Sequence, residues 1–248
     1  MTVALFAPCF VDQFRASAAI AALRVLERLG VDVEVPSGAA CCGQPPANAG
    51  FEDEGAPALE RFVRTFRRYD TIIVLSGSCA LHVRMHAAAF GDDGAGVAAR
   101  TTEYCTYLHD VIGLDRLSSL GAERNARAAV HIGCHALRGL GLASPSELQE
   151  PRYDRVRAVL STVRGLTFAD LDRPDECCGF GGSFSVDEPA VSARMGLDRL
   201  ADYGKGGAEL LVSTDVSCLL HLDGLARRLG VSLPVMHVAE LLAGEVSA

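Results

Sequence analysis

The residues best suited to chemistry in this chain are its cysteines, because eight of the nine fall into two sets with one arrangement. Each set has a single cysteine, then an adjacent pair followed by glycine, then another single cysteine. The sets are Cys9, Cys41, Cys42 and Cys79, and Cys134, Cys177, Cys178 and Cys218. Cysteine thiolates are the usual ligands of iron-sulfur clusters. The pattern predicts one or two [4Fe-4S] clusters with these eight residues as ligands.

The glycine after each pair fits such a site. Neighbouring residues of an extended strand point to opposite faces, so two adjacent thiols reach one centre only if the backbone turns sharply. Gly43 and Gly179 tolerate the positive φ of such a turn and let the backbone approach a bulky cluster. The run from Gly179 to Gly182 adds amides that could donate hydrogen bonds to sulfur, and such bonds tune reduction potential.

Other uses of these cysteines remain open. A buried cysteine can be a small apolar side chain, which is our interpretation of Cys105, the ninth cysteine. Four thiolates also satisfy a zinc site in a structural or interaction protein, although the paired CxxC sequences typical of such sites are absent. A reductase with a reactive cysteine pair is a third possibility, and a vicinal disulfide would need strained geometry.

A duplicated series of strands and helices is expected to position the cysteines. Short apolar runs predict strands at 3–7, 31–35 and 71–75, and again at 129–133, 168–171 and 209–213. Apolar spacing predicts helices at 17–29, 57–69 and 189–203. The closing segments 104–113 and 234–244 both resemble a strand running into an apolar helix.

This order predicts an α/β fold of two pseudo-repeated Rossmann-like units with mostly parallel sheets. We place the repeats at 1–122 and 123–248, with a linker near 121–127. The cysteines should then lie on loops at the C-terminal ends of the strands, which is the edge where such sheets bind ligands.

Composition excludes several classes of function. The net charge of −8 repels nucleic acid and anionic membranes, and charges interrupt every apolar stretch long enough to span a bilayer. The apolar start of the chain lacks a basic leader, so we expect no signal peptide and a cytoplasmic protein. Cytoplasmic thiols stay reduced, which argues against a disulfide framework.

Two histidines lie near the predicted ligands. His135 follows Cys134, and His221 lies shortly after Cys218. Either could touch a cluster, but hydrogen bonding or solvent exposure is the expectation. The glycine-rich stretches complete neither a dinucleotide fingerprint nor a phosphate loop, so a partner must supply any hydride acceptor.

Several sequence segments resemble a known family. They are Cys41-Cys42-Gly43-Gln44-Pro45, Ser76-Gly77-Ser78-Cys79, Cys177-Cys178-Gly179-Phe180-Gly181-Gly182 and the ending Met236-His237-Val238-Ala239-Glu240-Leu241. They are similar to the cysteine-rich CCG domain proteins, which include a component of heterodisulfide reductase and the iron-sulfur component of glycolate oxidase. The likeness is greatest to the lactate-utilisation group and spans nearly the whole chain.

The resemblance implies an iron-sulfur electron-transfer subunit of a system that oxidises L-lactate, or another 2-hydroxy acid, to a 2-oxo acid. Its implied partners are the other subunits, including a ferredoxin-like iron-sulfur protein. In heterodisulfide reductase a CxxC follows each CCG, whereas Ser76 and Asp215 stand at its first position here. Asp215 could bind iron or, as we favour, cap the following helix; Ser76 should be a turn residue. Four cysteines per half suit an ordinary cubane, which argues against direct disulfide reduction.

Overall fold

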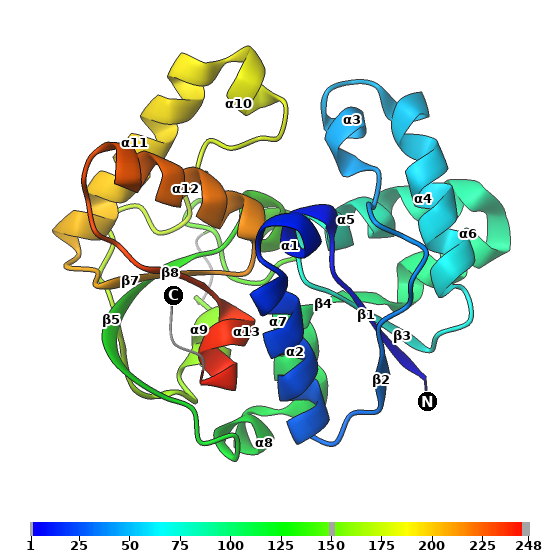
Figure 1. The fold of residues 1–248 in the computed structure, drawn as a ribbon, viewed down its shortest axis with the longest axis horizontal. Coiled ribbons are helices and arrows are strands. Elements are labelled where there is room, and N and C mark those ends of the chain that lie inside the picture. The colour runs from blue at the N-terminus through cyan, green and yellow to red at the C-terminus, as the bar shows by residue number, and fades with distance from the viewer. Residues whose placement is uncertain (1, 149–151, 245–248) are drawn as a thin grey trace.

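The computed structural model describes residues 2–148 and 152–244, and these form two four-stranded sheets in which every pairing is parallel. The first sheet has the order β2-β1-β3-β4 and the second the order β6-β5-β7-β8, so the topology repeats (Figure 1). The strands are β1 (Val3–Phe6), β2 (Val33–Glu34), β3 (Thr71–Val74), β4 (Thr101–Glu103), β5 (Glu123–His131), β6 (Arg164–Phe168), β7 (Leu210–Ser213) and β8 (Val235–His237).

Helices connect the strands and cover both faces of each sheet. In the first half they are α1 (Cys9–Phe14), α2 (Ala16–Arg28), α3 (Gln44–Asn48), α4 (Glu52–Phe66), α5 (Gly77–His86), η1 (Ala87–Phe90), α6 (Gly91–Arg100), α7 (Tyr104–Tyr107), η2 (Leu108–Ile112) and α8 (Leu114–Ser118). In the second half they are η3 (His135–Gly139), α9 (Arg155–Leu160), α10 (Phe184–Asp187), α11 (Pro189–Lys205), α12 (Val216–Arg228) and α13 (Val238–Ala243).

Side chains of the strands alternate between a central core and two outer cores. In β1, Val3 and Leu5 join the central core, whereas Ala4 and Phe6 join the outer core of the first half. In β5, Ala128 belongs to the central core and Ala129 to the outer core of the second half. This period of two is the expected property of a sheet buried on both faces.

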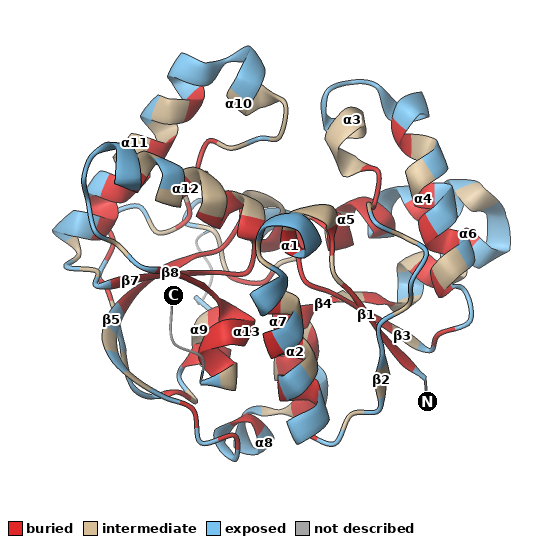
Figure 2. Ribbon diagram, viewed as in Figure 1, coloured by how far each residue is buried: buried red, intermediate tan, exposed pale blue. Residues whose placement is uncertain are grey.

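The central core is shared by the two halves. It joins apolar residues of both sheets to α2, α7, α9 and α13, which lie between the sheets (Figures 1 and 2). Helix α2 packs directly against α13, and α5 packs against η3. At that second contact a Cβ placed on Gly77 would lie 2.3 Å from the Cβ of Ala136, so only glycine permits the approach.

The predicted fold class is confirmed: the chain is α/β and consists of two pseudo-repeated Rossmann-like units with parallel sheets. The linker expected at 121–127 was wrong, because β5 already begins at Glu123 and pairs with β6 through its charged, partly exposed first half. An ion pair between Arg164 and Glu123 at 2.9 Å accompanies that pairing. The 122/123 boundary between repeats stays a prediction.

Further element boundaries differ from expectation. Strand β6 ends at Phe168, where the expected strand began, and α4 begins at Glu52, so that Pro57 lies inside the helix. The fourth strand of the first sheet is β4, which ends just before Tyr104; the predicted closing segment is therefore helical from its start. Polar strand residues such as Thr101 and Glu103 carry no hydrophobic signal.

Among the described residues, no helix combines the length and the apolar character that crossing a membrane requires.

Candidate metal centre

Both cysteine sets lie beyond the C-terminal ends of the strands. Cys9 and Cys134 each come three residues after the last residue of β1 and of β5. Contrary to the expectation of loops alone, three cysteines lie in helices: Cys9 begins α1, and Cys79 and Cys218 lie in the first turns of α5 and α12. The N-terminal amides of those helices favour the negative charge of a thiolate or of a cluster.

The four cysteines of the first set form a chain of pairwise contacts. Cys41 shares thiol hydrogen bonds with both Cys42 and Cys9, and Cys42 also bonds Cys79. The bonds from Cys42 and Cys9 lower the pKa of Cys41, whereas the bond to Cys41 raises the pKa of Cys9. One sulfur of the set is thus placed to carry the negative charge, and its neighbours hold their protons.

The second set repeats this arrangement with its own residues. Cys177 shares hydrogen bonds with Cys134 and Cys178, and Cys178 also bonds Cys218. The bonds from Cys134 and then Cys178 lower the pKa of Cys177, and the bond to Cys177 raises that of Cys178. In each half, the structure therefore brings together the same four cysteines that the sequence pattern grouped into one set. Their role as ligands remains a prediction.

The two CCG turns have the same backbone geometry. Gly43 and Gly179 have φ of 91° and 89°, which confirms the expected positive φ. A Cβ on Gly43 would lie 2.5 Å from the carbonyl oxygen of Gly55 on α4, and one on Gly179 would lie 2.5 Å from that of Ser192 on α11. Glycine is needed in each turn for both its backbone conformation and this close approach to a helix.

The turn amides reach sulfur, as expected from the glycine pattern. The amide N–H of Gly43 donates to Sγ of Cys41, and that of Gly179 donates to Sγ of Cys177, both at 3.4 Å. The acceptors are the two sulfurs with lowered pKa. Amide donors of this kind stabilise a thiolate and raise the reduction potential of a cluster.

A cavity of about 430 Å³ lies between the two sets. Its lining includes Cys9, Cys42 and Cys79 from the first set and all four cysteines of the second. Both sets thus border one space, at which the two halves of the molecule meet. The apolar ring of Phe10 also lines it, and lies 5.4 Å from the ring of Phe180 in the opposite half.

Asp215 and Ser76, at equivalent positions in the two halves, contact each other in this region. Oδ2 of Asp215 accepts hydrogen bonds from Oγ of Ser76 and Oγ of Ser78, both at 3.0 Å. The expected helix cap was wrong: within the described chain, the Asp215 side chain accepts no bond from the backbone of α12. Ser76 does cap its helix, because its Oγ accepts from the amide of Cys79 at 3.3 Å.

The remaining candidates from the sequence lie as expected. His135 lies 3.4 Å from Nε2 of Gln44, and Nε2 of His221 lies 3.3 Å from the carbonyl oxygen of Ser192. Both are hydrogen-bonded and partly buried, and His135 also lines the cavity. Cys105 is fully buried in the central core, as expected, and burial raises its pKa; its thiol also shares a hydrogen bond with Glu103.

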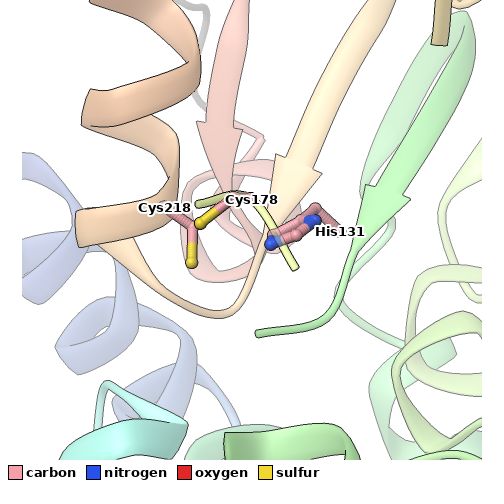
Figure 3. Close-up of side chains that lie close together, drawn as sticks. All are labelled: His131, Cys178 and Cys218. Atoms are coloured by element: carbon pink, nitrogen blue, oxygen red, sulfur yellow. The ribbon is translucent and has the colours of Figure 1, made fainter. Parts of the chain in front are cut away.

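Sequence reasoning missed His131, the last residue of β5. A ring nitrogen of His131 and the sulfurs of Cys178 and Cys218 lie within 4.8 Å of one another. Figure 3 shows these three side chains close together. Nδ1 of His131 lies 2.9 Å from the hydroxyl of Tyr203. Burial, followed by the charge of Arg199, lowers the pKa of His131 to about 3. Its place three residues before Cys134 is the signal that could have found it.

The residues present fit an iron-sulfur cluster in each half. Four thiols from three separate segments meet in each set, one sulfur of each accepts a backbone N–H, and a cavity borders both. These are the donor type, the number and the hydrogen bonding that a [4Fe-4S] cluster uses.

Comparison with known proteins agrees with this geometry. A family model described as a cysteine-rich domain (CCG) matches residues 3–84 and 128–223. Proteins named lactate utilization protein A, from Bacillus cereus (strain G9842) and Bacillus thuringiensis (strain Al Hakam), are each 35% identical to the chain over 248 residues, which is 98% of each sequence. Lactate utilization protein A 2 of Bacillus anthracis (strain CDC 684 / NRRL 3495) matches equally well. The chain therefore belongs to the family of cysteine-rich CCG domain proteins that includes lactate utilization protein A.

Proposed function

We propose that this chain is an iron-sulfur electron-transfer subunit of a lactate utilization system, in which L-lactate is oxidised to pyruvate. The observation that carries the proposal is the convergence of two sets of four thiols, each within hydrogen-bond contact of its neighbours. Full-length similarity to proteins named for lactate utilization supports the process.

In this proposal each cysteine set holds one [4Fe-4S] cluster, which supplies one-electron transfer when it is bound. The chain contributes the rest. Its amides at Gly43 and Gly179 hold the charge of a thiolate in each set. The helix N-termini that carry Cys79 and Cys218 favour the same charge.

Oxidation of a 2-hydroxy acid removes a hydride, and that step needs a flavin or nicotinamide. No fingerprint for either is present in the sequence. We therefore assign the substrate step to a partner protein and electron transfer to this chain, in the cytoplasm. A ferredoxin-like protein is a suitable second partner, because it exchanges single electrons.

Zinc is the second candidate, since His131, Cys178 and Cys218 form a group that could hold a metal ion. A zinc site of these three residues would use only the second cysteine set, and it would leave the equivalent first set unexplained. Zinc would bind without inorganic sulfide, so a sulfide assay separates the two candidates.

The function can be tested by growth of a Bacillus strain that lacks lactate utilization protein A. We expect this chain to restore growth on L-lactate, and the Cys105→Ser variant to do so equally, because Cys105 lies in the central core. Cys41→Ser and Cys177→Ser should fail although the proteins accumulate. Full growth with both of those variants would contradict the proposed role of the cysteine sets.

A further inference from the structure

The two cysteine sets have different surroundings, although the halves share one topology. Behind the first set lie three phenylalanines in mutual ring contact: Phe6 lies 4.9 Å from Phe62 and 5.6 Å from Phe66, measured between ring centroids. Phe6 is the last residue of β1, and the other two are on α4. This side of the first set is apolar.

Equivalent positions in the second half carry polar residues. His131 ends β5 as Phe6 ends β1, each three residues before the first cysteine of its set. Gly43 contacts Gly55 on α4, and Gly179 contacts Ser192 on α11, so these two helix positions are equivalent. Aligned on them, Phe62 corresponds to Arg199, and Phe66 corresponds to Tyr203. The phenylalanine trio of the first half is thus a His131–Tyr203–Arg199 trio in the second.

These three polar side chains form a directed series of hydrogen bonds. Nε of Arg199 donates to the hydroxyl of Tyr203 at 3.3 Å, and that hydroxyl lies 2.9 Å from Nδ1 of His131. Arginine has no acceptor, so the tyrosine oxygen accepts from it. The hydroxyl is buried and its other neighbour is Nδ1, so we assign the hydroxyl proton to the bond with Nδ1. A second partner fixes the guanidinium, because Nη1 of Arg199 lies 3.0 Å from Oδ2 of Asp202.

The direction of this series decides the tautomer of His131. When Nδ1 accepts the tyrosine proton, the ring proton of a neutral imidazole is on Nε2. Nε2 is buried and has no hydrogen-bond partner among the described residues. Nδ1 is occupied by the tyrosine, so Nε2 is the ring nitrogen left free, and the ring lies beside Cys178 and Cys218, with one nitrogen within 4.8 Å of their sulfurs.

We propose that His131 donates a hydrogen bond from Nε2 to a sulfur of the second cysteine set, and that this bond gives the second centre the higher reduction potential of the two. The inference rests on the proposed function, because it requires a cluster in each set. A buried N–H that points at sulfur stabilises the more negative, reduced cluster. The first set has Phe6 at this position and therefore lacks the donor. A nitrogen that keeps its proton is also not a metal ligand, so His131 is a positioning and tuning residue.

The test is a redox titration, followed by paramagnetic resonance, of anaerobically reconstituted protein. The signals of the two centres are assigned with Cys41→Ser and Cys177→Ser. His131→Phe copies the residue of the first half and should shift the potential of the second centre downward, with no change in the first centre or in iron content. His131→Gln retains a donor and an acceptor and should keep the potential near that of the unsubstituted protein.

Three results would overturn the inference. The first is an unchanged second potential in His131→Phe. The second is a fall of its iron content to that of Cys177→Ser, which would make His131 a ligand. The third is wild-type protein without iron and sulfide, which is failure of the proposed function itself and is recognised before any titration. If His131→Phe does not fold, His131→Leu decides: it also removes the N–H donor and should lower the second potential, and no shift would contradict the inference.

Discussion

At the scale of single residues, the thiols of each set are not equivalent. Cys41 and Cys177 accept hydrogen bonds both from neighbouring thiols and from a turn amide, and these bonds lower their pKa. Cys42 and Cys178 are more deeply buried, and their pKa is raised by the bonds to Cys41 and Cys177. The metal-free chain therefore concentrates the negative charge of each set on one accessible sulfur.

This asymmetry predicts selective alkylation of the metal-free, reduced protein. At neutral pH, Cys41 and Cys177 should react with iodoacetamide faster than the other cysteines, because the thiolate is the nucleophile and the lowered pKa keeps it ionised. Peptide mass spectrometry over a time course measures the order of modification. The fully buried Cys105 should react last, and modification of Cys42 or Cys178 before their neighbours would contradict the assignment of charge.

At the scale of elements, the CCG turns hold the cysteine pairs against α4 and α11. Gly43→Ala should destabilise the protein strongly, since the new Cβ would lie 2.5 Å from a carbonyl oxygen and the residue keeps a positive φ. Gly50→Ala is the matched control, because Gly50 has a φ of 86° but nothing within 4 Å of the new Cβ.

Urea unfolding of the two variants distinguishes the cost of a positive φ from the cost of the steric contact with the carbonyl oxygen. Gly50→Ala should lose about 1–2 kcal/mol of unfolding free energy, the usual cost of a left-handed residue with a side chain. Gly43→Ala should lose about 1–3 kcal/mol more because of the crowding. Equal losses would show that the contact with Gly55 does not constrain the turn.

Helix α7 begins with a buried carboxyl group. The side chain of Glu103 accepts a hydrogen bond from the amide of Thr106 at 2.9 Å, and burial raises its pKa from 4.5 to about 8. The folded state therefore holds this proton more tightly than the unfolded chain. The unfolding free energy should fall as pH rises from about 4.5 toward 8, by up to ~1.4 kcal/mol per pH unit.

Glu103→Gln tests this pH dependence, since glutamine can still accept the Thr106 amide but does not ionise. Below pH 4.5 the two proteins should differ little, and the variant should become progressively more stable than the unsubstituted protein as pH rises toward 8. The measurement is urea unfolding at several pH values in that range. A constant difference between the proteins would contradict the raised pKa.

The topology and the membership of each cysteine set could be predicted from the sequence because both depend on repetition. Apolar runs mark buried strands, and the end of each parallel strand falls at one edge. The contacts of Asp215 could not be predicted, since its partners Ser76 and Ser78 belong to the other half. The position of His131 three residues before Cys134 is visible in the sequence, but its hydrogen-bonded partners are not, because only folding brings Tyr203 and Arg199 beside it.

At the scale of the whole molecule, the halves are joined by a shared core and by polar contacts, among them the bonds between Asp215 and two serines of the first half. Asp215→Ala removes the carboxylate that accepts from the hydroxyls of Ser76 and Ser78 and should cost about 1–3 kcal/mol of unfolding free energy. Ser217→Ala, which removes only the bond at 2.9 Å to the other oxygen of Asp215, should cost about 0.5–1.5 kcal/mol. A larger loss in Ser217→Ala would show that the contact between the halves contributes little.

In the proposed function, the thiols of each half surround one inorganic iron-sulfur core. Iron and acid-labile sulfide per chain, measured after anaerobic purification together with the paramagnetic resonance of the reduced protein, test it most directly. The prediction is iron and sulfide in equal amounts, about four of each for every occupied set, with a signal that Cys177→Ser removes in part and Cys105→Ser leaves intact. Colourless protein that contains zinc and no sulfide would contradict it.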